Sequence, residues 1–242
     1  MLKTVLNNKP LLKNSISGFK NSAGRNSSGK ITIYNRGGGH KKKKRKINFL
    51  RETTSLGIVI SLEYDPNRSS YIASIYNYLN KSYYYILLPD KISIGDIIQS
   101  GVNSDLRLGN SLPLYKIPVG SYIHNIAKKR KSIFTRSAGT YSIILEKNEF
   151  NVKIKLRSGE IKSISKNCFA TIGVVSNEKH SLKILKKAGR SRWLNNRPKV
   201  RGVAMNPVDH PHGGGEGKTS GGKIQLTPWG LPTKNKPTKK IK

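Results

Sequence analysis

The stretch from Met205 to Gly217 holds the densest set of side chains that could do chemistry. Its four ionisable groups within eight residues are Asp209, His210, His212 and Glu216. Imidazole and carboxylate groups bind metal ions and transfer protons, so one hypothesis is a metal-dependent hydrolase. Pro211 stands between the two histidines and prevents both from lying on one helix face, and the HExxH scaffold is absent.

The same stretch also fits a glycine-rich loop threaded through RNA. Asn206 and the two histidines would supply hydrogen-bonding groups, and the glycines would let the backbone approach closely. The surrounding sequence is too hydrophilic to exclude water, as a catalytic pocket normally does. Composition favours the RNA loop over catalysis, and both hypotheses stay open. The three consecutive glycines are Gly213, Gly214 and Gly215.

A second unusual motif places a glycine run beside dense positive charge. It begins at Arg36 and continues through Gly37, Gly38, Gly39, His40, Lys41, Lys42, Lys43, Lys44, Arg45 and Lys46. Glycine lets backbone amides approach a phosphate, so the motif predicts a polyanion contact without sequence preference. The Gly-Lys-Ser/Thr ending of a Walker motif is absent. A flexible loop before a basic linker is the alternative, because polybasic runs are usually disordered when free.

Net charge points to the same kind of partner. The chain has 242 residues, with 46 Lys and Arg against 12 Asp and Glu, for a net charge of +34. Residues 1–46 carry 13 basic and no acidic side chains, and residues 183–242 carry a net charge of +13. Like charges repel in a compact state, and nucleic acid offsets that repulsion while releasing counterions. The middle, 47–182, carries a net charge of only +8 and resembles an ordinary globular body.

Arginines and a tryptophan gather where the C-terminal region begins. Arginine suits bidentate phosphate contacts and stacking better than lysine does. A tryptophan in such a core-poor segment either packs on the globular body or stacks on a base or ribose, and both interpretations stay open. These residues are Arg190, Arg192, Trp193, Arg197 and Arg201, with a second tryptophan at Trp229.

The elements that must position these groups are β-strands in the middle of the chain. Short β-branched and aromatic runs lie at close spacing, with turn residues at Asp65–Arg68, and Leu108–Gly120 reads as a linker between two bodies. This pattern predicts an all-β fold of two small barrels. The expected strands are Leu56–Tyr64, Tyr71–Leu79, Tyr83–Leu88, Asp96–Ser100, Tyr122–Ile126, Thr140–Lys147, Asn151–Arg157, Glu160–Ser165 and Phe169–Val175.

The two ends have little hydrophobic periodicity. Residues 1–30 are expected to be extended or irregular, Ile31–Tyr34 to form a short strand, and Ser181–Lys187 to form one or two helical turns. Prolines after Gly189 rule out a long helix there. Cys168 is the single cysteine, so no internal disulfide or cysteine-based zinc site can form. No apolar run is long enough to cross a bilayer, and no amphipathic helix supports a membrane-surface protein.

Several long motifs, in order, resemble the ribosomal protein L-two family of the large subunit. They lie at Gly24–Thr32, Arg36–His40, Glu63–Ser69, Arg136–Thr140, Leu156–Glu160 and Arg201–Gly217. The resemblance covers the chain from about Ser22 to its end. It implies long irregular basic N- and C-terminal extensions around an oligonucleotide-binding-type (OB-fold-like) barrel and an SH3-like barrel. The domains expected on this basis are a basic arm 1–30, an OB-fold-like RNA-binding domain 31–110, an SH3-like barrel 111–189 and an extended rRNA-binding tail 190–242.

The resemblance implies primary rRNA binding, subunit association and support of the peptidyl-transferase region. The bond-forming chemistry belongs to RNA in this family, so the chain is not expected to be an enzyme, and His210 is a supporting residue rather than a general base. The contacts expected beyond the motifs above are Arg25, Lys30, Arg68 and Arg136. This chain departs from the family in a shortened arm before Ser22, a more purely cationic Lys41–Lys46 run and a short final tail.

The expected partners are large-subunit rRNA, neighbouring large-subunit proteins and small-subunit rRNA at the subunit interface. No membrane span, small-molecule substrate or intrinsic cofactor is expected, and Mg²⁺ enters only as ions associated with rRNA. The bias towards Asn, Lys, Ile, Tyr and Ser is typical of an AT-rich organelle genome and favours a ribosome in the mitochondrial matrix. A plastid or a bacterial cytoplasm is the alternative.

Overall fold

The computed structural model describes residues 6–128, 131–217, 219 and 221–234. The chain divides into two compact units. Unit 1 comprises the described residues of 1–20 and 41–184, and unit 2 comprises those of 21–40 and 185–242. The expected arm 1–30 and tail 190–242 therefore extend partly outside the described residues. Their boundaries, and those of the two expected barrel domains, remain predictions.

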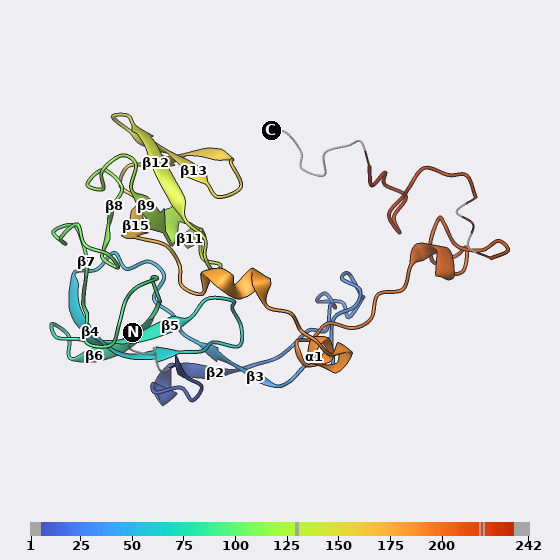
Figure 1. The fold of residues 1–242 in the computed structure, drawn as a ribbon, viewed down its shortest axis with the longest axis horizontal. Helices are drawn as coiled ribbons and strands as arrows, with labels where there is room; N and C mark the ends of the chain where they lie inside the picture. Colours follow the sequence, from blue (N-terminus) through green and yellow to red (C-terminus); the bar gives the residue numbers. More distant parts are fainter. Residues whose placement is uncertain (1–5, 129–130, 218, 220, 235–242) are drawn as a thin grey trace. The chain divides into compact units, whose positions relative to one another are not determined.

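Four strands form the first barrel-like body of unit 1 (Figure 1). They are β4 (Ser55–Glu63), β5 (Ile72–Asn77), β6 (Ser82–Leu87) and β7 (Ile97–Ser100). β4 pairs antiparallel with β5 and β7, and β6 pairs with β5. Side chains alternate between the two faces of a strand, so the aliphatic residues gather on one face. The core that they form contains Val59, Leu62, Ala73, Ile75, Ile86, Leu88, Ile92 and Ile98.

A second set of strands encloses a separate core in unit 1. It consists of β8 (Ser111–Pro113), β9 (Tyr122–His124), β12 (Ser142–Lys147), β13 (Asn151–Leu156), β14 (Ile161–Ser165) and β15 (Phe169–Ile172), with the pair β10 (Ile126–Lys128) and β11 (Lys131–Phe134) beside it. Val152 and Ile154 are buried while Lys153 and Lys155 are exposed, as their alternation predicts. This core contains Leu112, Leu114, Ile117, Ile123, Ile126, Ile144, Val152, Ile154, Ile164 and Ala170.

The two bodies share one continuous sheet, which runs in the order β14-β13-β12-β9-β15-β8-β7-β4-β5-β6. The connection between the bodies is a single parallel pairing of Ser100 in β7 with Ser111 in β8. The all-β fold class with two barrel-like bodies is confirmed. The strands predicted in the middle of the chain are confirmed too, with ends that differ by a few residues.

The segment Leu108–Gly120 is not the linker that its glycines and prolines predicted. It contains β8, and the side chains of Leu112, Leu114 and Ile117 are at most 1% exposed. Prolines can lie at edges and turns without disrupting a core. The glycines and prolines of this segment therefore indicated its tight turns correctly, but they did not indicate that its leucines and isoleucine pack in the core.

The N-terminal end of unit 1 is more ordered than its composition predicted. β1 (Leu6–Asn7) pairs with β4, and a 3₁₀ turn (Lys13–Ser15) precedes β2 (Ile16–Phe19). β2 pairs antiparallel with β3 (Lys42–Arg45), which lies in the polybasic run. The prediction of an irregular 1–30 segment is wrong for these residues. Backbone pairing stabilises a ribbon here that has no alternating hydrophobic pattern.

Unit 2 contains little regular structure. Its only α-helix among the described residues is α1 (Ala188–Trp193), with a 3₁₀ turn at Gly202–Ala204. The helix predicted at Ser181–Lys187 is wrong, because a 3₁₀ turn (Glu178–Leu182) ends within that segment and α1 begins after it. Ile31–Tyr34 is no strand, since only Ile31 forms an isolated bridge, with Arg25. No helix in the described ranges has the length and apolar character needed to cross a membrane.

Candidate nucleic-acid interface

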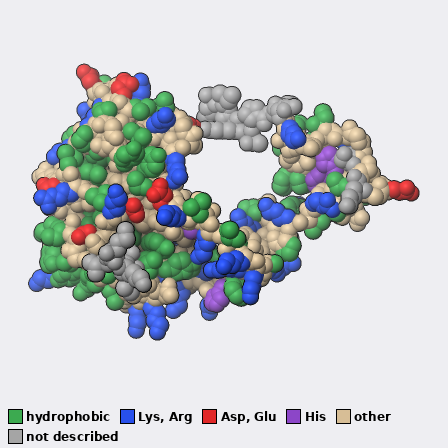
Figure 2. Space-filling view, viewed as in Figure 1, with side chains coloured by type: hydrophobic (Ala, Val, Ile, Leu, Met, Phe, Trp, Pro, Cys, Tyr) green, Lys and Arg blue, Asp and Glu red, His purple; other side chains and the backbone are tan. Residues whose placement is uncertain are grey.

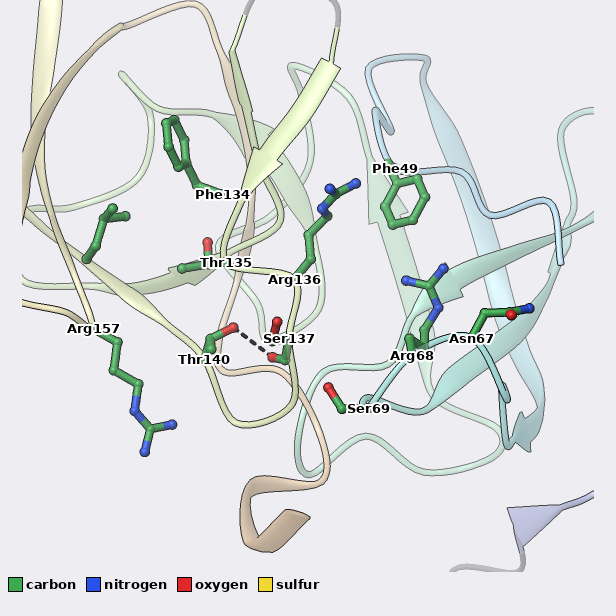
Figure 3. A pocket seen from close by; sticks show the side chains of 11 residues that line it. Phe49, Asn67, Arg68, Ser69, Phe134, Thr135, Arg136, Ser137, Thr140 and Arg157 are labelled. Atoms are coloured by element: carbon green, nitrogen blue, oxygen red, sulfur yellow. Dashed lines mark hydrogen bonds between the residues drawn. The ribbon is translucent and has the colours of Figure 1, made fainter. Parts of the chain in front are cut away.

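A cavity of about 730 Å³ opens in unit 1 between the turn after β4 and the segment after β11. Figure 3 shows three arginines around it, with Phe49 beside two of them. The side chains that matter most for its chemistry are Phe49, Arg68, Ser69, Arg136, Thr140 and Arg157. We call this cavity the arginine pocket.

The turn Asp65–Arg68 places the first arginine. Asp65 is 1% exposed, and its Oδ2 atom accepts a hydrogen bond from Arg68 Nε at 2.7 Å. Its Oδ1 atom accepts the backbone N–H of Asn67 at 2.9 Å, the turn bond that Asp side chains commonly make. A buried carboxylate therefore orients Arg68 while the rest of the guanidinium faces the pocket (Figure 3).

Arg136 reaches the same pocket from the second body. Its guanidinium carbon lies 5.0 Å from the centroid of the Phe49 ring, and that of Arg68 lies 5.3 Å from the same centroid. The backbone around the two arginines is joined by Ser70 Oγ, which donates to the Arg136 carbonyl at 3.5 Å, and by the Ala138 N–H, which donates to Ser69 Oγ at 3.1 Å. Sequence reasoning named both arginines separately, and the structure brings them together.

Arg157 is a pocket residue that sequence reasoning did not select. It follows β13, donates to the backbone carbonyl of Gly139, and has its guanidinium carbon 5.9 Å from the Tyr141 ring centroid. Its outward position in the alternating strand and its place in the Leu156–Glu160 motif were the available indications. The pocket lining thus carries three permanently charged guanidinium groups and no carboxylate, while Asp65 lies behind it and pairs with Arg68. This arrangement suits phosphate oxygens, which guanidinium groups bind bidentately.

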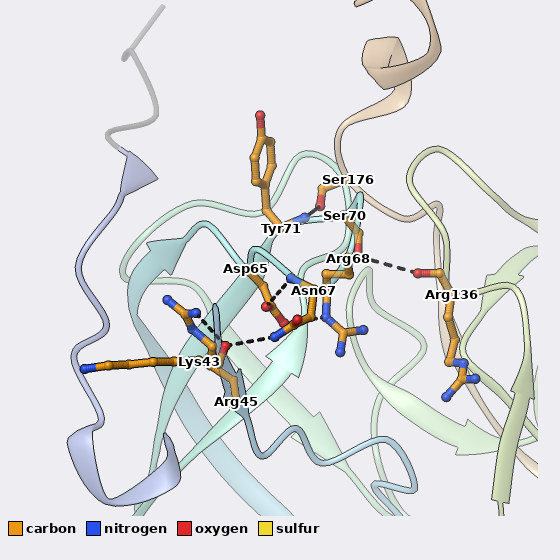
Figure 4. A network of polar contacts seen from close by, with 9 residues as sticks. All are labelled: Lys43, Arg45, Asp65, Asn67, Arg68, Ser70, Tyr71, Arg136 and Ser176. Atoms are coloured by element: carbon orange, nitrogen blue, oxygen red, sulfur yellow. Dashed lines mark hydrogen bonds and ion pairs between the residues drawn. The ribbon is translucent and has the colours of Figure 1, made fainter. Parts of the chain in front are cut away.

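The polybasic strand β3 is attached to the same turn (Figure 4). The carbonyl of Lys43 accepts hydrogen bonds from Asn67 Nδ2 at 2.8 Å and from Arg45 Nη1 at 3.2 Å. Arg45 is buried, whereas Lys41, Lys43, Lys44 and Lys46 are exposed. The run therefore presents its lysine charges from an ordered ribbon instead of the flexible linker that was the alternative.

The glycine run lies in unit 2, against the residues that follow α1. The N–H of Gly37 donates to the Asn195 carbonyl at 3.3 Å, and the N–H of His40 donates to the Trp193 carbonyl at 3.0 Å. A Cβ atom added to Gly39 would lie 2.7 Å from the Cβ of Asn195. Glycine here permits close approach of the chain to itself. Phosphate contact by these glycines remains a prediction.

The arginines and the tryptophan around α1 and the glycine run are mostly exposed to solvent. Arg36, Arg190, Arg197 and Arg201 are exposed, and Trp193 is 66% exposed, so it does not pack on a core. Arg192 is half-buried, and its Nη1 atom has no hydrogen-bond partner. Arg25 and Lys30 are exposed at either end of a tight turn in which Lys30 N–H donates to Asn26 Oδ1 at 2.9 Å. Lys and Arg side chains are scattered over the visible face, and acidic ones are fewer (Figure 2).

His210 and His212 are built into a compact turn of unit 2. Both are 8% exposed, and their rings stack with centroids 5.3 Å apart. Nδ1 of His210 accepts the His212 N–H at 3.0 Å, and Nε2 of His212 accepts the Leu226 N–H at 2.9 Å. A Cβ atom on Gly202 would lie 2.5 Å from the His210 ring. Each ring therefore accepts a hydrogen bond from a backbone N–H and stabilises the turn.

The glycines of this turn serve the same packing. A Cβ atom on Gly213 would meet the Asn206 carbonyl oxygen at 2.2 Å, and one on Gly214 would meet Pro207 at 2.6 Å. Asp209, Gly215 and Glu216 are exposed. Among the described residues, no three His, Cys, Asp or Glu side chains gather where they could hold a metal ion. One nitrogen of each histidine accepts a backbone N–H, and both carboxylates are exposed, so the described residues do not form the geometry of a metal-dependent hydrolase centre.

The sequence analysis did not single out Arg51 and His124, two basic residues that are buried in unit 1. Arg51 is 2% exposed and donates to the Gly109 carbonyl at 2.8 Å, the Gln99 carbonyl at 3.1 Å and Ser100 Oγ at 3.0 Å. Burial lowers its pKa to about 10, although Tyr84 opposes the shift. Burial also lowers the pKa of His124 to about 4, against a hydrogen bond to the Gly173 carbonyl, and Arg51 lowers it further. Nothing in their sequence context distinguished them from surface residues.

The fold and these surfaces define a class: an all-β protein whose arginine- and lysine-rich surfaces suit a phosphate polymer. Residues 12–100 match the family model for the RNA-binding N-terminal domain of Ribosomal Proteins L2, and residues 107–230 match that for their C-terminal domain. The large ribosomal subunit protein uL2 of Wolbachia from Brugia malayi is 51% identical over 225 residues, which is 92% of this chain and 82% of that protein. That of Rickettsia akari is 50% identical over 234 residues, covering 96% and 85%.

The chain therefore belongs to the L2 family of ribosomal proteins. This membership gives it a structural, RNA-binding role in the ribosome. The resemblance predicted from the sequence motifs is confirmed, and the family is one of structural components of the ribosome.

Proposed function

We propose that the arginine pocket is a principal rRNA contact of this protein. The observation that carries the proposal is the convergence of Arg68 and Arg136 on one aromatic ring, in a cavity that also holds Arg157. Two guanidinium groups held together offer a geometry for phosphate that scattered surface lysines do not. The β3 lysines, attached to the same turn by Asn67, extend this contact along the backbone.

Unit 2 adds a second contact surface in the proposal. Exposed Arg36, Arg190, Arg197 and Arg201 neutralise phosphates, and the open face of Trp193 stacks on a base or ribose. His210 and His212 act indirectly, by keeping the Met205–Gly217 turn in shape beside rRNA. Support of the peptidyl-transferase region is thus positional, and catalysis belongs to the RNA.

The specific binding partners are inferred from the same cationic surfaces. We infer large-subunit rRNA as the main partner, with neighbouring large-subunit proteins and small-subunit rRNA at the subunit interface. Mg²⁺ takes part as ions associated with the rRNA. The net charge of +34 supports a partner of high negative charge density over a small-molecule substrate.

The experiment is rRNA binding by the full chain at several salt concentrations. In-vitro transcribed large-subunit rRNA of Rickettsia conorii, the source of a 50% identical relative, is the probe. Arg68→Ala/Arg136→Ala and Lys41→Ala/Lys42→Ala/Lys43→Ala/Lys44→Ala should each weaken binding. Each lost phosphate contact should reduce the slope of log K against log salt by about 0.7–0.9. An unchanged affinity and slope for the arginine variant would remove the pocket from the interface.

The compartment is a separate proposal. The Asn-, Lys-, Ile-, Tyr- and Ser-rich composition supports a ribosome of the mitochondrial matrix, while the relatives described above are bacterial. Fractionation of the source cells decides between them. The protein should sediment with large subunits from purified mitochondria, and its recovery with plastid or bacterial cytoplasmic ribosomes would contradict the proposal.

A further inference from the structure

The ring of Phe49 occupies an unusual place in the arginine pocket. Two guanidinium groups of like charge approach it, each with its carbon within 5.3 Å of the ring centroid (Figure 3). Asp65 compensates the charge of Arg68 at 2.7 Å. Among the described residues, no ion pair links Arg136 to a carboxylate. In the described part of the structure, the Phe49 ring is therefore the partner of the Arg136 guanidinium.

Physical chemistry explains what such a ring can do. The face of an aromatic ring carries negative electrostatic potential and attracts a cation placed over it. Arginine side chains are long and flexible, and a binding site whose groups are already ordered loses less conformational freedom when its ligand arrives. One ring in contact with two guanidinium groups can therefore hold together two charges that would otherwise move apart.

The position of Phe49 is itself fixed from both bodies of unit 1. Its side chain packs against Ile47, Ile72 and Tyr85, which form a small apolar cluster. Its carbonyl accepts a hydrogen bond at 2.7 Å from Nδ2 of Asn125, which lies between β9 and β10. Phe49 is thus held from both bodies. Of the two arginines, Arg68 is also oriented by Asp65, so Arg136 is the one that depends most on the ring.

We propose that Phe49 is a positioning residue, which holds Arg68 and Arg136 as one pair for the phosphate backbone of rRNA. The proposal rests on the proposed function, since it assumes that the two arginines bind RNA. Phe49 itself need not touch the RNA. Its effect on binding should therefore exist only while the two arginines are present.

A double-mutant cycle tests this dependence. The full chain is prepared with Phe49→Leu, which keeps an apolar side chain and removes the ring. It is also prepared with Phe49→Tyr, which keeps an aromatic ring. Each change is made in the native protein and in the Arg68→Ala/Arg136→Ala background. Affinity for the transcribed Rickettsia conorii rRNA is measured at one fixed salt concentration, and thermal melting is recorded for every variant. Phe150→Leu, at a side chain that is 75% exposed, is the matched control.

Phe49→Leu should weaken binding about fivefold in the native protein, from the loss of two cation–ring contacts. Phe49→Tyr should bind within about twofold of the native protein, because it keeps the ring face. In the double-arginine background, Phe49→Leu should cause no further loss. Phe150→Leu should leave binding unchanged. If Phe49→Leu melts below the assay temperature, Phe49→Met takes its place.

Three results would overturn the proposal, and they differ in what else they refute. An equal loss from Phe49→Leu in both backgrounds would show that Phe49 acts on the structure independently of the arginines. Native affinity in the Arg68→Ala/Arg136→Ala protein would refute the pocket as an rRNA contact, and the positioning role would fall with it. Weaker binding of that protein together with native affinity of Phe49→Leu would leave the proposed function intact and refute only the role of Phe49.

Discussion

Unit 1 and unit 2 are held together by different means. Unit 1 buries two aliphatic clusters and a smaller one, and every buried hydrophobic side chain among the described residues lies between Ile47 and Val175. The described part of unit 2 buries His210 and His212 instead. It is held together by close contacts at glycines and by backbone hydrogen bonds. Both units carry exposed cationic side chains.

This difference teaches which part of the protein can be stable by itself. Aliphatic burial is the main favourable term in folding, and unit 1 has it. Unit 2 must order its backbone with little apolar burial, so the binding of rRNA has to supply much of its stability. The protein thus joins a self-sufficient β body to a segment that is shaped for, and completed by, its partner.

The largest effect is expected from the core of unit 1. Ile123→Ala should lower the free energy of unfolding of the RNA-free protein by about 2–5 kcal/mol, because Ile123 is fully buried. Chemical denaturation followed by circular dichroism measures it. Ile184→Ala, at a 76% exposed position, should change it by less than about 0.5 kcal/mol. His210→Ala in unit 2 should leave it unchanged, and a drop as large as that of Ile123→Ala would show that the two units unfold as one.

The next effect is a pH dependence confined to unit 1. The folded pKa of His124 is about 4 against an ordinary value of 6.5, so between these values the unfolded chain binds more protons than the folded one. The free energy of unfolding should fall by about 3 kcal/mol as the pH is lowered from 6.5 towards 4. Denaturation curves across this range measure it.

A matched pair of variants isolates this contribution. His124→Gln, which keeps a donor near the Gly173 carbonyl, should flatten the pH dependence in that window, whereas His180→Gln at an exposed position should not. Equal pH dependence in the two variants would assign the effect to other groups.

The smallest effect concerns the attachment of β3 to unit 1. Asn67→Ala removes the hydrogen bond to the Lys43 carbonyl and should lower the free energy of unfolding by about 0.5–1 kcal/mol. Asn148→Ala, at an exposed turn residue, is the control. In Asn67→Ala, loss of hydrogen-exchange protection at Lys42–Arg45 alone would show that Asn67 attaches β3 to the rest of unit 1. Unchanged protection would mean that β2 holds the polybasic strand without Asn67.

The sequence predicted the β body well because period-two alternation and turn residues are local signatures of strands. Val152 to Leu156 and Asp65 to Arg68 are examples. It failed where structure depends on pairing instead of pattern. β3 consists of lysines and an arginine, and only β2, placed far away in the sequence, makes it a strand.

The candidate site was predicted residue by residue but not as an arrangement. Arg68 and Arg136 were both selected from the family motifs, whereas their meeting at Phe49 depends on how two bodies share one sheet. His210 and His212 were expected to face RNA, and in this structure one nitrogen of each ring accepts a hydrogen bond from a backbone N–H. No local pattern distinguishes a histidine that stabilises a turn from one that binds a ligand.

Hydrogen exchange of the full chain, free at low ionic strength and bound to the large-subunit rRNA, tests the central claim most directly. The strands of unit 1 should be protected in both states, while the amides of 21–40, 185–217 and 221–234 should exchange rapidly in the free protein and slowly in the complex. Slow exchange throughout unit 2 without RNA, or no added protection when RNA binds, would contradict the account.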